Sequence, residues 1–159
     1  MNLDYYKSWS KSSQSRHKNI PASYLVLINP AQEVLLLRRF NTGFKDGMYS
    51  LVAGHVDAGE TFTTALIREA QEESGIMVAP EDIEVVHVMH RKSDTDGSER
   101  VDVFYKVDKW SGEIVNCEPE KCDELSWHSL EALPDTVIPY IKQALISIKN
   151  GVVYSEFGW

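Results

Sequence analysis

Four glutamates gather in one short stretch in the middle of the chain, GHVDAGETFTTALIREAQEESGI, residues 54–76. They are Glu60, Glu69, Glu72 and Glu73. Because the chain already carries a formal net charge of −8, these carboxylates repel one another unless a cation lies among them. Clustered carboxylate oxygens on a rigid element are suitable ligands for Mg²⁺ or Mn²⁺, which commonly bridge a protein to substrate phosphates. The stretch therefore predicts a divalent metal site that acts on a phosphate compound.

The residues around these glutamates are predicted to form a helix. The pattern from Thr61 to Ser74 is helical, and the following Gly75 is typical of a helix end. At about 100° per residue, the last three glutamates fall within about 100° of arc and border the apolar positions. We expect this acidic line to face a cleft against a sheet. The alternative is a solvated acidic face that Arg68 partly neutralises.

The spacing of the stretch resembles the motif of a known family. Gly54, five residues, Glu60, seven residues and then REAQEESGI from Arg68 match the Nudix box, GX5EX7REUXEEXGU, in which U is aliphatic. The chain is similar to Nudix hydrolases from about Ile20 to its end. Its segment NCEPEKCDELSWHSLEALP is similar to the MutT-like nucleoside triphosphate diphosphatases. The resemblance implies an α/β fold, specifically an α/β/α sandwich with a mixed β-sheet between helices.

The resemblance also implies the metal ligands and the cofactor. Glu69, Glu72 and Glu73 would bind Mg²⁺, with Mn²⁺ as a substitute, and the backbone carbonyl of Gly54 or of its neighbour Ala53 is a further ligand. Glu72 and Glu73 would also take part in catalysis, in which water attacks a phosphorus and cuts a pyrophosphate linkage.

Two further residues of the box have structural roles by the same resemblance. Glu60 and Arg68 would orient the helix and the preceding loop. The chain departs from the usual pattern just before the box, where Val52 and Ala53 stand in place of a proline and a glycine.

By the same resemblance, one more catalytic glutamate is expected from a loop before the last strand. Glu120 is the best positional match, since it lies seven residues before Trp127, and Glu118 is the second. The alternative for Glu120 is a solvated loop residue.

Substrate phosphates require cations. Arg38 or Arg39 could bind them, but only one of two adjacent strand residues can face the cleft. Arg91 and Arg100 are interpreted instead as edge charges on outer strands.

A nucleotide base requires an aromatic or apolar wall. Tyr49, Phe104 and Trp127 are the candidates, and each has the alternative of a place in the core.

The remaining elements are predicted from apolar patterns and turn residues. Residues 22–28 and 33–39 are expected to form a hairpin, and residues 48–54 an extended run. Further strands are expected at 83–91, 100–107 and 123–130. A second helix should begin near residue 136 and end at Asn150.

Length and composition favour one domain of residues 20–159 preceded by a polar segment, residues 1–19. No apolar run approaches the roughly 20 residues that span a membrane, and the amino terminus lacks a signal-peptide core, so we expect a cytoplasmic protein. The acidic balance argues against nucleic-acid polymers and membranes as partners but allows a small nucleotide. The aromatic ending SEFGW favours docking on the domain or a homodimer contact.

The sequence therefore predicts an Mg²⁺-dependent pyrophosphohydrolase that converts a nucleoside triphosphate to the monophosphate and pyrophosphate. One alternative is hydrolysis of another nucleoside diphosphate compound, such as a sugar nucleotide or a dinucleotide. Another is a nucleotide-sensing module without turnover, against which the intact acidic set counts.

Overall fold

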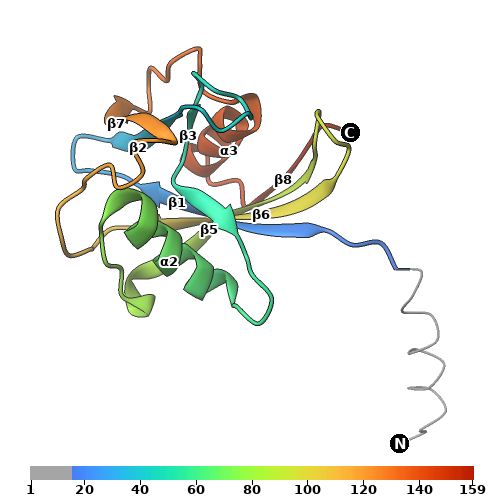
Figure 1. Cartoon of the computed structure of the whole chain (residues 1–159), viewed down its shortest axis with the longest axis horizontal. Helices are drawn as coiled ribbons and strands as arrows, with labels where there is room; N and C mark the ends of the chain where they lie inside the picture. Colours follow the sequence, from blue (N-terminus) through green and yellow to red (C-terminus); the bar gives the residue numbers. More distant parts are fainter. Residues whose placement is uncertain (1–15) are drawn as a thin grey trace, which may run out of the picture.

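The computed structural model describes residues 16–159, so most of the predicted polar segment lies outside the described residues. Figure 1 shows the chain. In sequence order the elements are β1 (Ile20–Leu27), β2 (Glu33–Arg39), β3 (Tyr49–Ser50), β4 (Ala53–His55), α2 (Phe62–Ser74), the short 3-10 helix η2 (Pro80–Asp82), β5 (Ile83–Lys92), β6 (Glu99–Val107), β7 (Cys122–Ser129), α3 (Pro139–Lys149) and β8 (Tyr154–Phe157). In this part of the chain no helix has the length and apolar character needed to cross a membrane.

The strands form two sheets. The larger is a mixed sheet in the order β4-β1-β6-β5-β8, in which β1 is parallel to β6 and β5 is parallel to β8. The smaller is antiparallel, in the order β3-β2-β7. The two helices lie on opposite sides of the larger sheet (Figure 1). The predicted α/β/α sandwich with a mixed sheet is confirmed.

The predicted hairpin of residues 22–28 and 33–39 is wrong beyond one bridge. A single bridge, between Ile28 and Val34, joins the two segments. Apart from it, β1 belongs to the larger sheet and β2 to the smaller. Both edges of β1 are already taken, by β4 on one side and β6 on the other. The extended run at residues 48–54 is similarly divided, since β3 pairs with β2 and β4 pairs with β1.

Alternation along β1 builds a separate core on each face of the larger sheet. Tyr24 and Val26 belong to the core that packs against α3, whereas Leu25 and Leu27 belong to the core that packs against α2. Successive side chains of a strand point to opposite faces, so one buried strand supports both helices.

The helix α2 has the predicted ends. Thr61 is its N-cap, and its side chain accepts a hydrogen bond from the backbone N–H of Thr64. Gly75 ends it in the left-handed conformation, with φ of 72°, and donates its N–H to the carbonyl of Gln71. These caps fix the register of the glutamates relative to the sheet.

The carboxyl terminus docks on the domain, as one of the two predicted alternatives states. β8 pairs with β5, and the Trp159 ring lies against His90 with ring centroids 4.8 Å apart and the ring planes tilted by 52°. A strand at this position was not predicted, because four residues with no clear alternation give no strand signal.

Candidate active site

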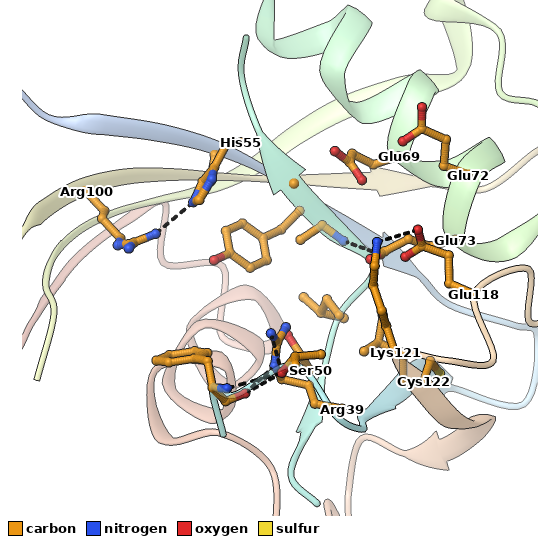
Figure 2. A pocket seen from close by; sticks show the side chains of 18 of the residues that line it. Arg39, Ser50, His55, Glu69, Glu72, Glu73, Arg100, Glu118, Lys121 and Cys122 are labelled. Carbon is orange, nitrogen blue, oxygen red and sulfur yellow. Dashed lines mark hydrogen bonds and ion pairs between the residues drawn. The ribbon is translucent and has the colours of Figure 1, made fainter. Parts of the chain in front are cut away.

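The main cavity lies between α2, the strand β4 and the ends of the central strands, and has a volume of about 690 Å³. Charged side chains of both signs line it. Figure 2 shows Glu69, Glu72 and Glu73 on one side of this pocket and His55 with Arg100 on the other. The acidic line of α2 therefore faces the predicted cleft.

Glu73 is the carboxylate most strongly affected by its surroundings. Its Oε2 accepts a hydrogen bond of 3.0 Å from the backbone N–H of Ala53, which ties α2 to β4. Burial nevertheless raises its pKa from 4.5 to about 8, and the charge of Glu69 adds to this rise. Burial also raises the pKa of Glu69, whereas Glu72 is exposed. A proton or a cation is therefore needed near Glu73 at neutral pH.

Gly54 lies directly against Glu69. A Cβ at this position would collide with the Glu69 side chain and displace its carboxyl group. The absence of a side chain at Gly54 therefore leaves room for the Glu69 carboxylate beside β4.

Arg68 is the cation among the carboxylates in this structure. It donates to Glu60 at 2.9 Å and 3.0 Å, and also to Glu69 and to Glu72, the latter at 3.3 Å. A further bond of 3.1 Å reaches the carbonyl of His55. Arg68 thus holds the box loop against the helix and offsets the acidic repulsion.

Glu60 fixes the same loop from its other side. Its Oε2 accepts from the backbone N–H of Asp57 at 3.0 Å, in addition to its two bonds from Arg68. The contacts of Glu60 and Arg68 thus agree with the structural roles that the resemblance implies.

The carboxylates suit a hard divalent cation by their chemistry. Within residues 16–159 no three acidic, histidine or cysteine side chains converge as a ready-made metal cage. Glu69 and Glu72 instead contact Arg68, whose side chain is 29% exposed. Carboxylate oxygens are the donors that Mg²⁺ prefers, so a cation bound by Glu69, Glu72 and Glu73 would take the place of Arg68 beside the first two. The residues fit the cation.

The loop before β7 brings Glu118 to the cavity and not Glu120. Glu118 lines the cavity, accepts a bond of 2.7 Å from Lys121, and its charge helps to raise the pKa of Glu73. Glu120 is exposed and is not part of the lining. Because the two residues are separated by one proline, spacing alone ranks them poorly; only the path of the loop decides which one faces inward.

The two adjacent arginines of β2 separate as strand alternation requires. Arg39 lines the cavity and donates to the carbonyl of Phe44 at 2.7 Å. Arg38 lies outside it and pairs with Asp123 and Glu124. The cavity thus receives Arg39.

The three aromatic candidates do not line the cavity. Phe104 is fully buried in the core and stacks on Tyr24. Tyr49 is buried and donates its hydroxyl to Glu124, and Trp127 packs against the core on the α2 side. Phe104 and Tyr49 thus have the core positions that were the alternative, and Trp127 is partly buried against the core.

Sequence reasoning missed the far side of the cavity. Arg91 and Arg100 line it, together with Tyr24 and Tyr140. Their interpretation as edge charges is wrong, because β5 and β6 are interior strands of the larger sheet and Arg91 is 4% exposed. Arg91 is the penultimate residue of β5 and Arg100 the second residue of β6, so the local pattern of neither strand marks them as pocket residues.

The fold and the site together define an α/β/α protein with an acidic pocket. The NUDIX domain family model matches residues 18–146, so the chain belongs to the Nudix family. It is 33% identical over 125 residues to the NAD-capped RNA hydrolase NudC of Pseudomonas aeruginosa. The matched stretch covers 75% of this chain and 40% of the relative. The NudC of Citrobacter koseri is 30% identical over 118 residues, which is 74% of this chain and 42% of the relative. The chain thus spans less than half the length of these relatives.

Solved structures show the same fold. A MutT NUDIX hydrolase from Burkholderia pseudomallei superposes with a TM-score of 0.74 at 25% identity, covering 82% of this chain and 98% of that one. A MutT protein from Methanosarcina mazei gives 0.72 at 23% identity, covering 85% and 96%. The Burkholderia structure supports the MutT-like assignment, and the Methanosarcina structure supports the fold.

Proposed function

We propose that this Nudix hydrolase is an Mg²⁺-dependent pyrophosphohydrolase that cleaves a nucleoside triphosphate to the monophosphate and pyrophosphate. One observation carries the proposal: α2 and the loop before β7 direct four carboxylates into a cavity that also holds cations. The carboxylates are Glu69, Glu72, Glu73 and Glu118. Carboxylates for a metal and cations for phosphate are the two requirements of such a substrate.

The carboxylates divide the work by their surroundings. Glu69, Glu72, Glu73 and the carbonyl of Gly54 would hold Mg²⁺, which when bound polarises phosphate oxygens and lowers the pKa of water. Glu73 is fixed by its bond from Ala53, so it is best placed to hold the attacking water in line with the phosphorus. When the metal binds, Arg68 would release Glu69 and Glu72 and keep its two hydrogen bonds to Glu60.

Cations beside the acidic group neutralise the substrate's phosphates. Arg39 reaches the cavity from β2 and Lys121 from the loop before β7. Lys121 is held beside Glu118, so the EPEKC segment supplies a carboxylate and a cation to the same place. The Glu118–Lys121 pair supports a nucleoside triphosphate as the substrate. The EPEKC segment that holds the pair is also the one that resembles nucleoside triphosphate diphosphatases.

A second candidate substrate is a dinucleotide with a diphosphate linkage. The relatives in Pseudomonas aeruginosa and Citrobacter koseri carry the name NAD-capped RNA hydrolase, and they match three quarters of this chain. The net charge of −8 favours a free dinucleotide over a nucleic-acid polymer. A cytoplasmic location belongs to the same proposal, since these nucleotides are found there.

A panel of compounds tests the proposal. Nucleoside triphosphates, sugar nucleotides and NAD⁺ are incubated with the protein and Mg²⁺, and products are identified by phosphorus NMR. We expect pyrophosphate and monophosphate from a triphosphate, with full loss of activity in EDTA and recovery with Mg²⁺ or Mn²⁺. Monophosphates from NAD⁺ alone would favour the second candidate. Binding without turnover of any compound would favour the nucleotide-sensing module.

A further inference from the structure

Two arginines face each other directly across the strands β5 and β6. Arg91 and Arg100 are partners in the antiparallel register, and both line the main cavity. Like charges at directly opposed positions of a sheet destabilise it. The two arginines therefore need negative charge beside them, and the protein supplies only part of that charge.

Arg91 is buried and only partly used. Its side chain is 4% exposed, and its Nε donates to Asp102 Oδ2 at 2.6 Å. Its guanidinium lies 3.9 Å from the ring centre of Tyr140, in a cation–π contact. Among residues 16–159 its Nη groups have no hydrogen-bond partner. They are free to donate to a ligand in the cavity.

Arg100 has a similar surplus of donors. Its Nη1 donates to His55 Nε2 at 2.8 Å, and its Nη2 lies 4.0 Å from Asp96. Its Nε is buried and has no partner within the described part of the chain. Because Asp96 is 58% exposed, it screens Arg100 only weakly.

The charges at this side of the cavity do not balance. Asp102 is the fully buried carboxylate that contacts this pair, and it reaches Arg91 through one oxygen. Asp102 is not part of the cavity lining, whereas the exposed Asp96 is. Arg91 has its counter-charge in Asp102, but Arg100 has only Asp96 at 4.0 Å, so the two guanidinium groups are not fully balanced. An oxyanion from solution would complete the arrangement.

The strand β4 joins this pair to the acidic side. The N–H of Ala53 bonds Glu73, Gly54 lies against Glu69, and His55 contacts Arg100. These three consecutive residues of β4 therefore lie between the glutamates of α2 and Arg100. Both groups line the same cavity, so one extended substrate in it would lie beside both.

We propose that Arg91 and Arg100 form an oxyanion site for a phosphate group that the substrate carries beyond the cleaved diphosphate linkage. The proposal deepens the proposed function and rests on it. Two sources supply this chemistry: the third phosphate of a nucleoside triphosphate, and a phosphate on the ribose of a dinucleotide. In either case the site selects substrates by an additional charge, through paired N–H donors that match a phosphate.

Two matched substrate pairs test the site in the full-length protein. One pair is a nucleoside triphosphate and its diphosphate, and the other is NADP⁺ and NAD⁺. In Arg100→Gln, we expect the KM for the member with the extra phosphate to rise about 10- to 100-fold more than that of its partner, as loss of a charge-assisted hydrogen bond requires. The pair that shows the difference identifies the source. Equal changes in both members of both pairs would overturn the proposal.

Control variants separate the site from general charge and from folding. Lys106→Gln removes a positive charge from β6, the strand that carries Arg100, at a position outside this cavity. It should leave the KM ratios unchanged. Arg91→Lys keeps the charge beside Asp102 but loses the Nη fork, so it should shift the ratio in the same direction while thermal unfolding stays cooperative. A folded Arg91→Lys protein with the native ratio would count against the site.

A titration without turnover keeps the site testable if the proposed function fails. Inorganic phosphate is added to the metal-free protein, and backbone amide signals of β5 and β6 are followed by NMR. We expect saturable shifts in the wild type and in Lys106→Gln, and none in Arg100→Gln. Identical titrations in all three proteins would refute the oxyanion site, whereas absence of hydrolysis of any compound would refute only the enzymatic proposal.

Discussion

The acidic and the basic sides of the cavity carry opposite charge and differ in how they are built. The acidic side comes from one continuous run of sequence, and one arginine, Arg68, serves three of its carboxylates. The basic side is assembled from three strands, and Asp102 serves Arg91 there. Both sides therefore hold an excess of one charge, which a substrate and its metal would balance.

The difference between them lies in burial. Arg68 is 29% exposed, although its partners Glu60 and Glu69 are 11% and 13% exposed, so the acidic side is more open to water than the basic side. Arg91 and Asp102 are 4% and 0% exposed, so the basic side is fixed in advance. One cavity thus combines an acidic side that is more open to water with a basic side that is buried. Four measurements test this difference.

The largest effect is expected from Glu73→Gln. The amide has nearly the same shape and can still accept from Ala53, but it cannot hold a metal and the attacking water. We expect kcat to fall about 10⁴-fold, which is about 5 kcal/mol at 1.36 kcal/mol per tenfold. Stability without metal should stay level or rise, since one repelling charge is lost. Steady-state kinetics and thermal unfolding of the same preparation check both; native turnover or an unfolded variant would contradict the assignment.

On the basic side, loss of a carboxylate should lower the stability of the protein, in contrast to Glu73→Gln on the acidic side. Asp102→Asn leaves Arg91 buried without a counter-charge, so we expect the free energy of unfolding to fall by about 3–5 kcal/mol. Asp96→Asn is the matched control, because Asp96 is an exposed partner of Arg100, and its stability should match the wild type. Urea unfolding measures both. A stable Asp102→Asn protein would show that the two sides do not differ in rigidity.

The pH dependence of stability should arise on the acidic side. Glu73 has its pKa raised by burial to about 8, above its value of 4.5 when exposed, so its proton stabilises the folded state. That contribution is fully present below pH 4.5 and is lost as the pH rises to about 8. We expect the metal-free wild type to lose about 2–3 kcal/mol relative to Glu73→Gln between pH 5 and 8, and Mg²⁺ to restore it. Parallel curves for the two proteins in EDTA would contradict this.

The smallest effect concerns the loop before β7. Glu118→Gln should lower kcat about 30-fold if this carboxylate assists proton transfer or metal binding beside Glu73. Glu120→Gln, two residues away and exposed, is the control and should retain native rates. Kinetics at saturating Mg²⁺ compare the two. A larger loss in Glu120→Gln would reverse the ranking that the structure supports and restore the one that spacing favoured.

The elements that sequence reasoning predicted well are those whose signals are local. The caps of α2 at Thr61 and Gly75 depend on neighbouring residues only, and so does the 3.6-residue period that aligns the glutamates. The separation of Arg38 from Arg39 also follows from strand alternation, although the sequence could not say which one enters the cavity. The hairpin between β1 and β2 was wrong because pairing depends on which strand edges are already occupied.

The sequence by itself determined the family, the α/β class and the acidic helix, because a motif of fixed spacing within 23 residues, Gly54 to Ile76, leaves little to the rest of the chain. Only the tertiary structure decided that Glu118 and Arg39 face the cavity. Only it placed Arg91, Arg100 and Asp102 together, since they lie on two strands whose register no local pattern reveals. The physical reason is the same in each case: burial and charge balance are properties of neighbours in space, and the sequence specifies those neighbours only through the completed fold.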